Sequence, residues 1–350
     1  LTFFEKHPVR FLSMSREGTL CFGFDGELYT CPAGGKPCKV PVSLAADRKE
    51  NPETYMTLGS DVDEMSLSPD GKEVAVIIRG EVYVSSVEHG TTRRITCTPE
   101  QERSVSYSPD GRSLLYASER NGSWNLYQTR LARSEENHFF RATLLKEEPV
   151  LEIPEETFQP SWSPDGGEVA FLEERTTLKV INLKTRQIRT ILPGTCQYSY
   201  ADGDQWYQWS PDGKWFLVQY FSQGRWSSEA GLVSANGDQK LINLTRSGYE
   251  DAQPRWMMGG KMMIWASDRF GMRSHGGFGR EQDVFGLFFS REAMERFRLS
   301  EEEFDLLKEQ EKKEKERKKA QDEKPGKGRK GEAEGTTPEP LKLDLVDLED

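Results

Sequence analysis

The tetrapeptide Ser-Pro-Asp-Gly occurs four times in this chain, and each copy lies between two short apolar runs. The copies begin at Ser68, Ser108, Ser163 and Ser210. Proline fixes φ at the second position of a turn, aspartate can hydrogen-bond the local backbone, and glycine accepts the positive φ that closes the loop. One such turn is common in β-rich proteins, but four copies at steps of 40, 55 and 47 residues indicate an internal repeat.

Two degenerate copies extend this array. Ser15-Arg16-Glu17-Gly18 stands in the place of the turn near the start of the chain, and residues 253–261 parallel residues 159–167. Asp25-Gly26, between alternating apolar residues, is a further hairpin signal. The turn centres then fall at residues 17, 70, 110, 165, 212 and 259, so we predict six structural units.

The unit around the first full copy shows how such a unit is built. After the turn, apolar residues alternate in two runs separated by Arg79-Gly80: Val74, Val76 and Ile78, then Val82 and Val84. This alternation predicts short antiparallel strands. Repeats of 40 to 55 residues with several strands each are typical of a β-propeller. We therefore predict an all-β fold, a β-propeller of four-stranded antiparallel blades, with a charged helical and disordered insertion near the C-terminus.

An aromatic residue precedes the turn in four units: Tyr107, Trp162, Trp209 and Trp256. We expect these side chains to pack between neighbouring blades, because large aromatic rings bury the most apolar area at such a junction. They are interpreted as core residues and not as stacking platforms for bases or sugars.

The repeat pattern ends near residue 290. Ser300 and Glu303 fit a capping box, which predicts the start of a helix. Phe304 and Leu307 give that helix a small apolar face, and residues 308–324 are almost entirely charged, so we expect a solvated helix or a disordered run. Residues 325–340 are rich in Gly, Pro, Lys and Glu and are predicted to be disordered, and alternating leucines from Leu341 suggest a further strand.

Composition limits the class of protein. The chain has 350 residues and a net charge of -11, which argues against nucleic acid as a general partner. It contains no apolar run of about 18 residues, so no membrane span is expected. Its five cysteines fit no Cys-x-x-Cys spacing and are interpreted as buried or free thiols. Because the chain starts at Leu1 and ends on an acidic run, we interpret it as an internal piece of a longer protein.

No catalytic motif is present in the sequence. Gly-x-Ser-x-Gly, the phosphate-binding loop and His-Glu-x-x-His are all absent. The four histidines lack metal-ligand spacing: His7, His89, His138 and His275. Asp202-Gly203-Asp204 is followed by no glutamate at calcium-loop spacing and is interpreted as a polar turn. We therefore predict no catalytic, cofactor-binding or metal-binding residue and no cofactor.

One Gly-rich loop, residues 271–279, has basic neighbours: Arg269, Arg273, His275 and Arg280. Such a loop can hold an anionic group. The loop is also explained as a long connection between blades, and we favour that interpretation.

The Trp/Tyr-Ser-Pro-Asp-Gly-Lys/Arg turns resemble the WD40-like repeats of TolB-type and tricorn-type propellers. The final third is more specific, because residues 267–276, 283–285 and 297–300 and the Lys/Glu-rich insertion look like bacterial tricorn protease homologues. The resemblance implies a six-bladed and then a seven-bladed propeller, followed by serine-peptidase domains of the S41 type with a PDZ domain. The catalytic Ser and His of that family lie downstream, so no residue here inherits a catalytic role.

This resemblance implies a division of the chain. Residues 1–42 would be the last blade of the six-bladed ring, and residues 43–290 five blades of the seven-bladed ring. Residues 291–340 would be the insertion, and residues 341–350 a strand that opens the next blade. The competing arrangement closes all six units into one ring, with residues 1–4 as its fastening strand.

Three functions follow from these alternatives. The chain is interpreted first as a non-catalytic propeller segment of a serine peptidase, a hydrolase, that gates or channels peptides to a downstream active site. The alternatives are a TolB-like interaction propeller with no enzyme attached, or the propeller of a prolyl-oligopeptidase-type enzyme. Expected partners are peptides, other domains of the same protein and a second copy in a homo-oligomer. Family analogy favours the bacterial periplasm or cell envelope over the cytoplasm.

Overall fold

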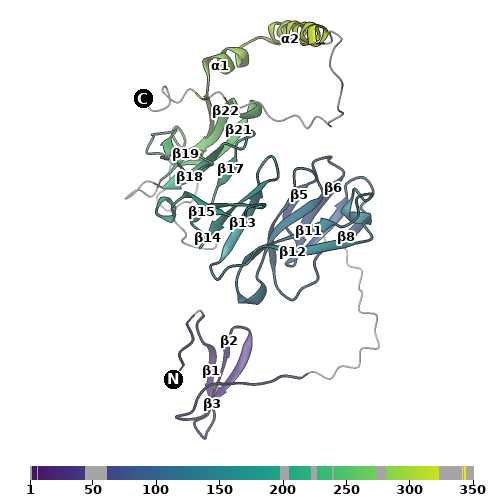
Figure 1. Ribbon diagram of the computed structural model, residues 1–350. Helices are drawn as coiled ribbons and strands as arrows, with labels where there is room; N and C mark the ends of the chain where they lie inside the picture. Colours follow the sequence, from purple (N-terminus) through teal and green to yellow (C-terminus); the bar gives the residue numbers. More distant parts are fainter. Residues whose placement is uncertain are drawn as a thin grey trace. The chain divides into compact units, whose positions relative to one another are not determined.

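The computed structural model describes residues 2–5, 7–43, 61–197, 205–221, 227–238, 240–272 and 281–322, together with residues 341 and 343. These residues form six antiparallel sheets and two α-helices. The chain divides into two compact units, Leu1–Asp61 and Val62–Asp350, which are described separately here as the first and second units (Figure 1). The predicted all-β fold with few helices is confirmed.

The first unit contains one four-stranded sheet in sequential order: β1 (Arg10–Met14), β2 (Leu20–Phe24), β3 (Glu27–Cys31) and β4 (Cys38–Lys39). The predicted hairpin at Asp25-Gly26 is present, with φ of 48° and 71° at its two residues. Residues 2–5 form no strand, and the ring of Phe4 instead stacks on Phe24 with centroids 3.9 Å apart. Phe22 beneath it is fully buried, so aromatic packing covers one face of this sheet.

In its described residues, the second unit contains five sheets in chain order, named here blades 1 to 5. Blade 1 is β5 (Val62–Leu67), β6 (Glu73–Ile78), β7 (Glu81–Ser86) and β8 (Thr92–Arg94). Blade 2 is β9 (Glu102–Tyr107), β10 (Ser113–Ser118), β11 (Asn125–Leu131) and β12 (Leu145–Leu151). Blade 3 is β13 (Thr157–Trp162), β14 (Glu168–Glu173), β15 (Thr177–Asn182) and β16 (Ile188–Leu192). Blade 4 is β17 (Tyr207–Trp209), β18 (Trp215–Phe221), β19 (Ser228–Ser234) and β20 (Ile242–Asn243), and the three-stranded blade 5 is β21 (Asp251–Met257), β22 (Met262–Ser267) and β23 (Asp283–Phe288).

The blades follow one another side by side. The first strands of neighbouring blades are in contact: β5 with β9, β9 with β13, and β17 with β21. Each Ser-Pro-Asp-Gly turn joins the first strand of its blade to the second, as the repeat predicts. Successive four-stranded antiparallel sheets that meet at their first strands are the arrangement of a β-propeller.

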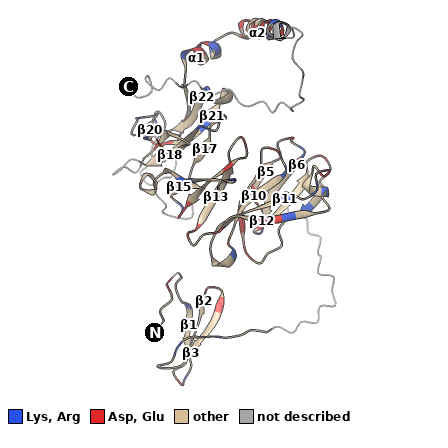
Figure 2. Cartoon of the chain, in the orientation of Figure 1, with Lys and Arg blue, Asp and Glu red and all other residues tan. Residues whose placement is uncertain are grey.

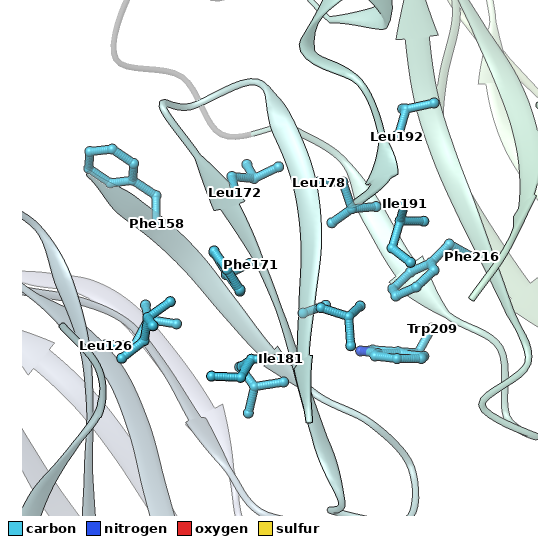
Figure 3. Close-up of a cluster of buried hydrophobic side chains, with 14 of the residues drawn as sticks. Leu126, Phe158, Phe171, Leu172, Leu178, Ile181, Ile191, Leu192, Trp209 and Phe216 are labelled. Carbon is cyan, nitrogen blue, oxygen red and sulfur yellow. The ribbon is translucent and has the colours of Figure 1, made fainter. Parts of the chain in front are cut away.

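The hydrophobic core lies at the junctions between blades. The largest cluster joins Leu126 of blade 2 to Phe171 of blade 3 and Phe216 of blade 4, and Figure 3 shows Trp209 beside Phe216 in this cluster. Tyr107, Trp209 and Trp256 are buried in the cores at the first strands of blades 2, 4 and 5, and Trp162 of blade 3 is half-buried against the largest core cluster. The predicted role of the aromatic residue before the turn is therefore confirmed.

Blade 1 presents the corresponding face to solvent. Met65 and Leu67 of β5 are 75% and 60% exposed, whereas the residues at the same positions of blade 2, Val105 and Tyr107, are buried. On the neighbouring strand β6, Val76 pairs with Met65 and Val74 pairs with Leu67. Blade 1 thus exposes an apolar face. In blade 2 the corresponding face is buried against the preceding blade.

The first strands of blades 2, 3 and 5 each contain a β-bulge, which the sequence did not predict. Ser104, Gln159 and Gln253 have φ of 58°, 50° and 52°, and strand register shifts beside each of them. All three lie four positions before the residue that aligns with the turn serine. A bulge re-aims the side chains of a strand and increases its twist, so these residues set the geometry of the blade junctions.

An insertion in blade 2 explains the uneven repeat. Residues 132–144 connect β11 to β12, and the short turn η2 (Phe139–Arg141) within them packs against β7 and β8 of blade 1. The backbone N of Phe140 donates a 2.9 Å hydrogen bond to Oε1 of Glu73, whose pKa is raised by burial. The 55-residue step between the second and third turns therefore contains a loop that ties blade 2 to blade 1.

Two helices follow blade 5. Helix α1 (Arg291–Phe297) begins at Ser290, whose side chain accepts a hydrogen bond from the backbone N of Ala293. The predicted capping box is present in α2 (Glu301–Asp322), because Ser300 Oγ and Glu303 exchange hydrogen bonds with each other's backbone N. Both signs of charge appear along α2, as expected for a solvated helix (Figure 2).

Several predicted segments fall outside the described residues. Most of the connector at 41–58, all of 325–340 and Leu345 belong to this group. Leu341 and Leu343 are described, and they pack against the core of blades 4 and 5. The division of the chain at residues 42, 290 and 340 and the choice between one ring and two stay predictions.

Candidate functional site

The hydrogen bonds within the repeated turns show what their serine and aspartate side chains do. In all four copies the serine Oγ donates to the aspartate Oδ1, at 2.7 Å in the first copy and 2.6 Å in the others. The same Oγ accepts a 2.9 Å bond from the backbone N five residues further on. These bonds hold the pKa of Asp70 and Asp165 below the ordinary aspartate value. The serine hydroxyl is thus engaged within its own turn, which gives the turn a structural role.

The turns also support one another across the blades. A Cβ atom added at the glycine of one turn would lie within contact distance of the proline Cδ of the preceding turn. The four contacts are Gly111 with Pro69 (3.5 Å), Gly166 with Pro109 (3.6 Å), Gly213 with Pro164 (3.6 Å) and Gly260 with Pro211 (3.2 Å). At Gly71 nothing in the described structure lies within 4 Å of that point. The proline of one turn therefore packs against the glycine of the turn in the next blade.

A polar pocket lies at the other ends of the first strands, between blades 1 and 2. Its volume is about 440 Å³. It is lined by the start of β5, the end of β6 with the following hairpin, and the start of β9: Asp63, Glu64, Ile77, Gly80, Gln101, Glu102 and Arg103. We take this pocket as the candidate functional site, because concave sites with convergent polar groups are where ligands bind.

Gly80 shapes one wall of the pocket. Its φ is 78°, in the left-handed region, and a Cβ there would lie 3.1 Å from Cγ of Gln101. Its carbonyl oxygen accepts a 2.7 Å hydrogen bond from the backbone N of Glu102. The hairpin of blade 1 therefore fits closely onto the strand entry of blade 2, and glycine meets both requirements of that position.

Glu102 is the unusual group in the pocket. Its side chain is 0% exposed. Oε1 accepts bonds of 2.9 Å from Thr98 Oγ1 and from Ser118 Oγ, and Arg120 approaches it at 3.4 Å. Oε2 is buried without a hydrogen-bond partner among the described residues. Burial raises the pKa of this carboxyl, since the charged form loses its hydration.

Arg120 does not neutralise Glu102 fully, because its stronger partner is Glu147. The guanidinium reaches the two carboxylate oxygens of Glu147 at 2.7 and 2.9 Å, and it lies 4.4 Å from the ring centroid of Tyr127. The hydroxyl of Tyr116 donates a third hydrogen bond to Glu147. This network holds Arg120 at Oε1 of Glu102, and Oε2 stays without a partner among the described residues.

Two further lining residues form an ion pair with each other. Oε1 of Glu64 lies 3.6 Å from Nε of Arg103, and Oε2 of Glu64 accepts a hydrogen bond from the backbone N of Ser104. Asp63, next to Glu64, is exposed. The pocket lining therefore holds three carboxylates and one guanidinium, which suits a ligand that carries positive charge or several hydrogen-bond donors.

The sequence analysis missed this pocket. Glu102 stands at the start of a strand, where a charged residue is ordinary. One signal was available: Glu102 pairs across its sheet with Ser118, and in blade 5 Asp251 pairs in the same way with Ser267. An acid facing a serine at the same place in two blades is a pattern that a repeat alignment could reveal.

The other sequence candidates are not brought together at this pocket. Arg269 lies against the rings of Tyr249 and Phe285, and the neighbouring loop residues Arg273, His275 and Arg280 lie outside the described part of the chain. His138 contacts Asp70 at 3.2 Å, and neither residue lines the pocket. Among the described residues, no group of three or more His, Cys, Asp or Glu side chains could hold a metal ion. All five cysteines are free thiols, and no described helix is long and apolar enough to cross a membrane.

Comparisons with known proteins place the fold. No protein-family model matches the chain. Over 171 residues it is 29% identical to Dipeptidyl-peptidase 5 of Porphyromonas gingivalis, a match that covers 43% of this chain and 23% of that protein. The crystal structure of tricorn protease aligns with a TM-score of 0.50 at 15% identity, over 82% of this chain and 27% of that one. A TolB from Agrobacterium tumefaciens aligns with a TM-score of 0.45 at 17% identity, over 65% of this chain and 81% of that one.

The alignment with tricorn protease agrees with the propeller fold of the blades. The identities with the two solved structures are low, so that likeness concerns the fold. The chain spans about a quarter of the length of the dipeptidyl-peptidase and of tricorn protease. The proteins that the chain resembles thus include two peptidases, one by sequence and one by fold.

Proposed function

We propose that this chain is a non-catalytic β-propeller segment of a serine peptidase of the tricorn type, and that it contacts peptides on their way to an active site elsewhere in the parent protein. The observation that carries the proposal is the pair of peptidase similarities, one in sequence and one in structure, each to about a quarter of the matched protein. A segment of that size fits a propeller within a larger enzyme.

The geometry of the chain supports a binding role for this segment. The serines of the four turns donate to aspartate and not to histidine, so they lack the base that activates a serine nucleophile. The pocket between blades 1 and 2 instead presents carboxylates at the ends of the first strands. Groups in that position contact whatever passes or docks near the centre of the blades.

The test compares the 350-residue chain with the product of its complete gene. We expect the chain alone to cleave no peptide, and the complete protein to cleave peptides through a serine that lies outside this chain. Substituting that serine by alanine should abolish turnover without changing peptide binding by the propeller. Gating predicts in addition that blocking the propeller slows the cleavage of long peptides more than that of short ones.

Three outcomes would overturn the proposal. Reproducible peptide cleavage by the purified chain would contradict a non-catalytic role. A gene without a peptidase domain would favour the TolB-like interaction propeller. A downstream Gly-x-Ser-x-Gly would replace the S41-type assignment by a prolyl-oligopeptidase type.

A further inference from the structure

We propose that the pocket between blades 1 and 2 binds a basic side chain, arginine or lysine, of a peptide. That the ligand is a peptide rests on the proposed function. That its side chain is basic rests on the charge of the pocket. It makes this place in the propeller a specificity site that distinguishes basic peptides from neutral ones.

The charge of the lining is the first argument. Asp63, Glu64 and Glu102 contribute three carboxylates and Arg103 one guanidinium. Since Arg103 pairs with Glu64, the two remaining carboxylates set the sign of the field inside the pocket. Walls that carry one sign of charge focus that field and attract ligands of the opposite sign.

The unpartnered oxygen of Glu102 is the second and independent argument. A buried polar atom without a hydrogen-bond partner is costly, and native proteins pair nearly all such atoms with protein groups or with an ordered molecule. Thr98, Ser118 and Arg120 all bond to Oε1 and none to Oε2. Because Glu102 is 0% exposed, a donor entering from the pocket would complete this carboxylate by displacing the side chains that cover Oε2.

A guanidinium or ammonium group meets both conditions. It carries the opposite charge and offers several N–H donors, and charge-assisted hydrogen bonds to carboxylates are among the strong ones. A pocket of about 440 Å³ has room for such a side chain. At the Gly80 wall the side chain of Gln101 packs directly against the glycine, so that wall is closed and the ligand would enter beside the other lining residues.

Arg120 does not fill this role itself. It is held by both oxygens of Glu147 and stacks on Tyr127, so moving it into the pocket would break the stronger of its two ion pairs. Glu81, the other acid near Glu102, is satisfied by Arg94 and by Thr96 Oγ1. Glu102 and Asp63 are therefore the carboxylates at which we place the cation of the ligand.

The experiment measures binding of fluorescent peptides to the 350-residue chain by anisotropy at low ionic strength. The first peptide is acetylated and contains one arginine, the second carries citrulline in its place, and the third has a free amino terminus but no basic side chain. We expect the arginine peptide to bind about tenfold more tightly than the citrulline peptide, and the preference to weaken with added salt.

Two variants test the assignment to this pocket. Asp63→Asn changes an exposed residue and should leave the fold intact while reducing the arginine preference. Glu102→Gln keeps the shape of the side chain and should abolish the preference. Glu135→Gln, an exposed acid on the loop of blade 2, is the matched control and should leave it unchanged.

Equal affinity for arginine and citrulline, or a preference that survives both pocket variants, would overturn the inference. Tighter binding of the peptide with the free amino terminus would overturn the assignment to a side chain. These results leave the peptidase proposal untouched, because that proposal is tested by the complete gene product and its cleavage of peptides.

Discussion

The indole Nε1 of Trp206 donates a 2.8 Å hydrogen bond to the carbonyl oxygen of Pro254, 48 residues further along the chain. Gln159 makes the same kind of connection one junction earlier, because its Nε2 donates a 2.7 Å bond to the carbonyl of Gln205. Both residues stand four positions before a turn serine, at the place of the bulges. Side chains at the bulge position thus join the backbone of one blade to that of the next.

We expect Trp206→Phe to lower the free energy of unfolding by about 1–2 kcal/mol, because the carbonyl oxygen of the buried Pro254 loses its hydrogen-bond donor. Urea unfolding followed by fluorescence measures this change. Trp215→Phe is the matched control, since no hydrogen bond involves its indole in the described structure. Equal losses in the two variants would show that ring volume and not the hydrogen bond is responsible.

Ser163→Ala should destabilise the protein by about 1–3 kcal/mol, because the hydroxyl both donates to Asp165 and accepts from the backbone N of Glu168. The exposed Ser134→Ala is the control and should have little effect. A neutral result at Ser163 would mean that the turn is held by its backbone alone.

The same variant gives a prediction for pH. The hydrogen bond from Ser163, followed by that from the backbone N of Gly167, lowers the pKa of Asp165 below its ordinary value of 3.8. A depressed carboxyl pKa stabilises the folded state above the unfolded pKa, and this stabilisation is lost as pH falls through the folded value. The stability deficit of Ser163→Ala relative to the natural chain should therefore be constant near neutral pH and narrow as pH falls below about 4. Unfolding curves at several pH values measure it, and a deficit that widens in acid would contradict this role of the serine.

The sequence predicts the repeat and the turns of this fold well, because their chemistry is local. Pro, Asp and Gly at fixed offsets determine a turn within four residues. In the hairpins at Asp25-Gly26 and Arg79-Gly80 both turn residues have positive φ, as two-residue hairpin turns require. The aromatic positions are predictable for the same reason, since each lies one residue before a turn.

The pocket is not predictable in this way, because it depends on contacts between blades. Glu102 is buried by Gly80 and by Arg120, which lie 22 residues before it and 18 after it in the chain. The bulge at Ser104 changes the face on which the following residues of β9 lie, so strict alternation misplaces them. Only the three-dimensional arrangement shows that Glu102 lacks a partner for one oxygen.

Phe139→Ala should cost about 3–5 kcal/mol, because this fully buried ring packs edge-on against Tyr107 with centroids 6.0 Å apart. The loop of residues 132–144 would then lose its anchor on blade 1. Leu144→Ala, in the same loop but half exposed, is the control. Hydrogen exchange should increase at Phe140, whose N–H bonds to Glu73, and unchanged protection there would contradict the anchoring role.

The exposed face of blade 1 gives a matched pair of substitutions at one structural position. Leu67 and Trp209 both stand directly before a turn, but Leu67 is 60% exposed and Trp209 is buried against blade 3. Trp209→Ala should therefore cost about 3–5 kcal/mol, since it removes a ring from a packed junction. Leu67→Ala should cost less than about 1 kcal/mol, because an exposed side chain loses little burial.

Urea unfolding of both variants, at several protein concentrations, measures the difference between these positions. A small loss at Leu67 that does not depend on concentration would agree with an uncovered face. A loss at Leu67 as large as that at Trp209 would show that another surface covers the apolar face of blade 1 in solution. A loss that grows with protein concentration would identify that surface as a second copy of the chain, because only association depends on concentration in this way.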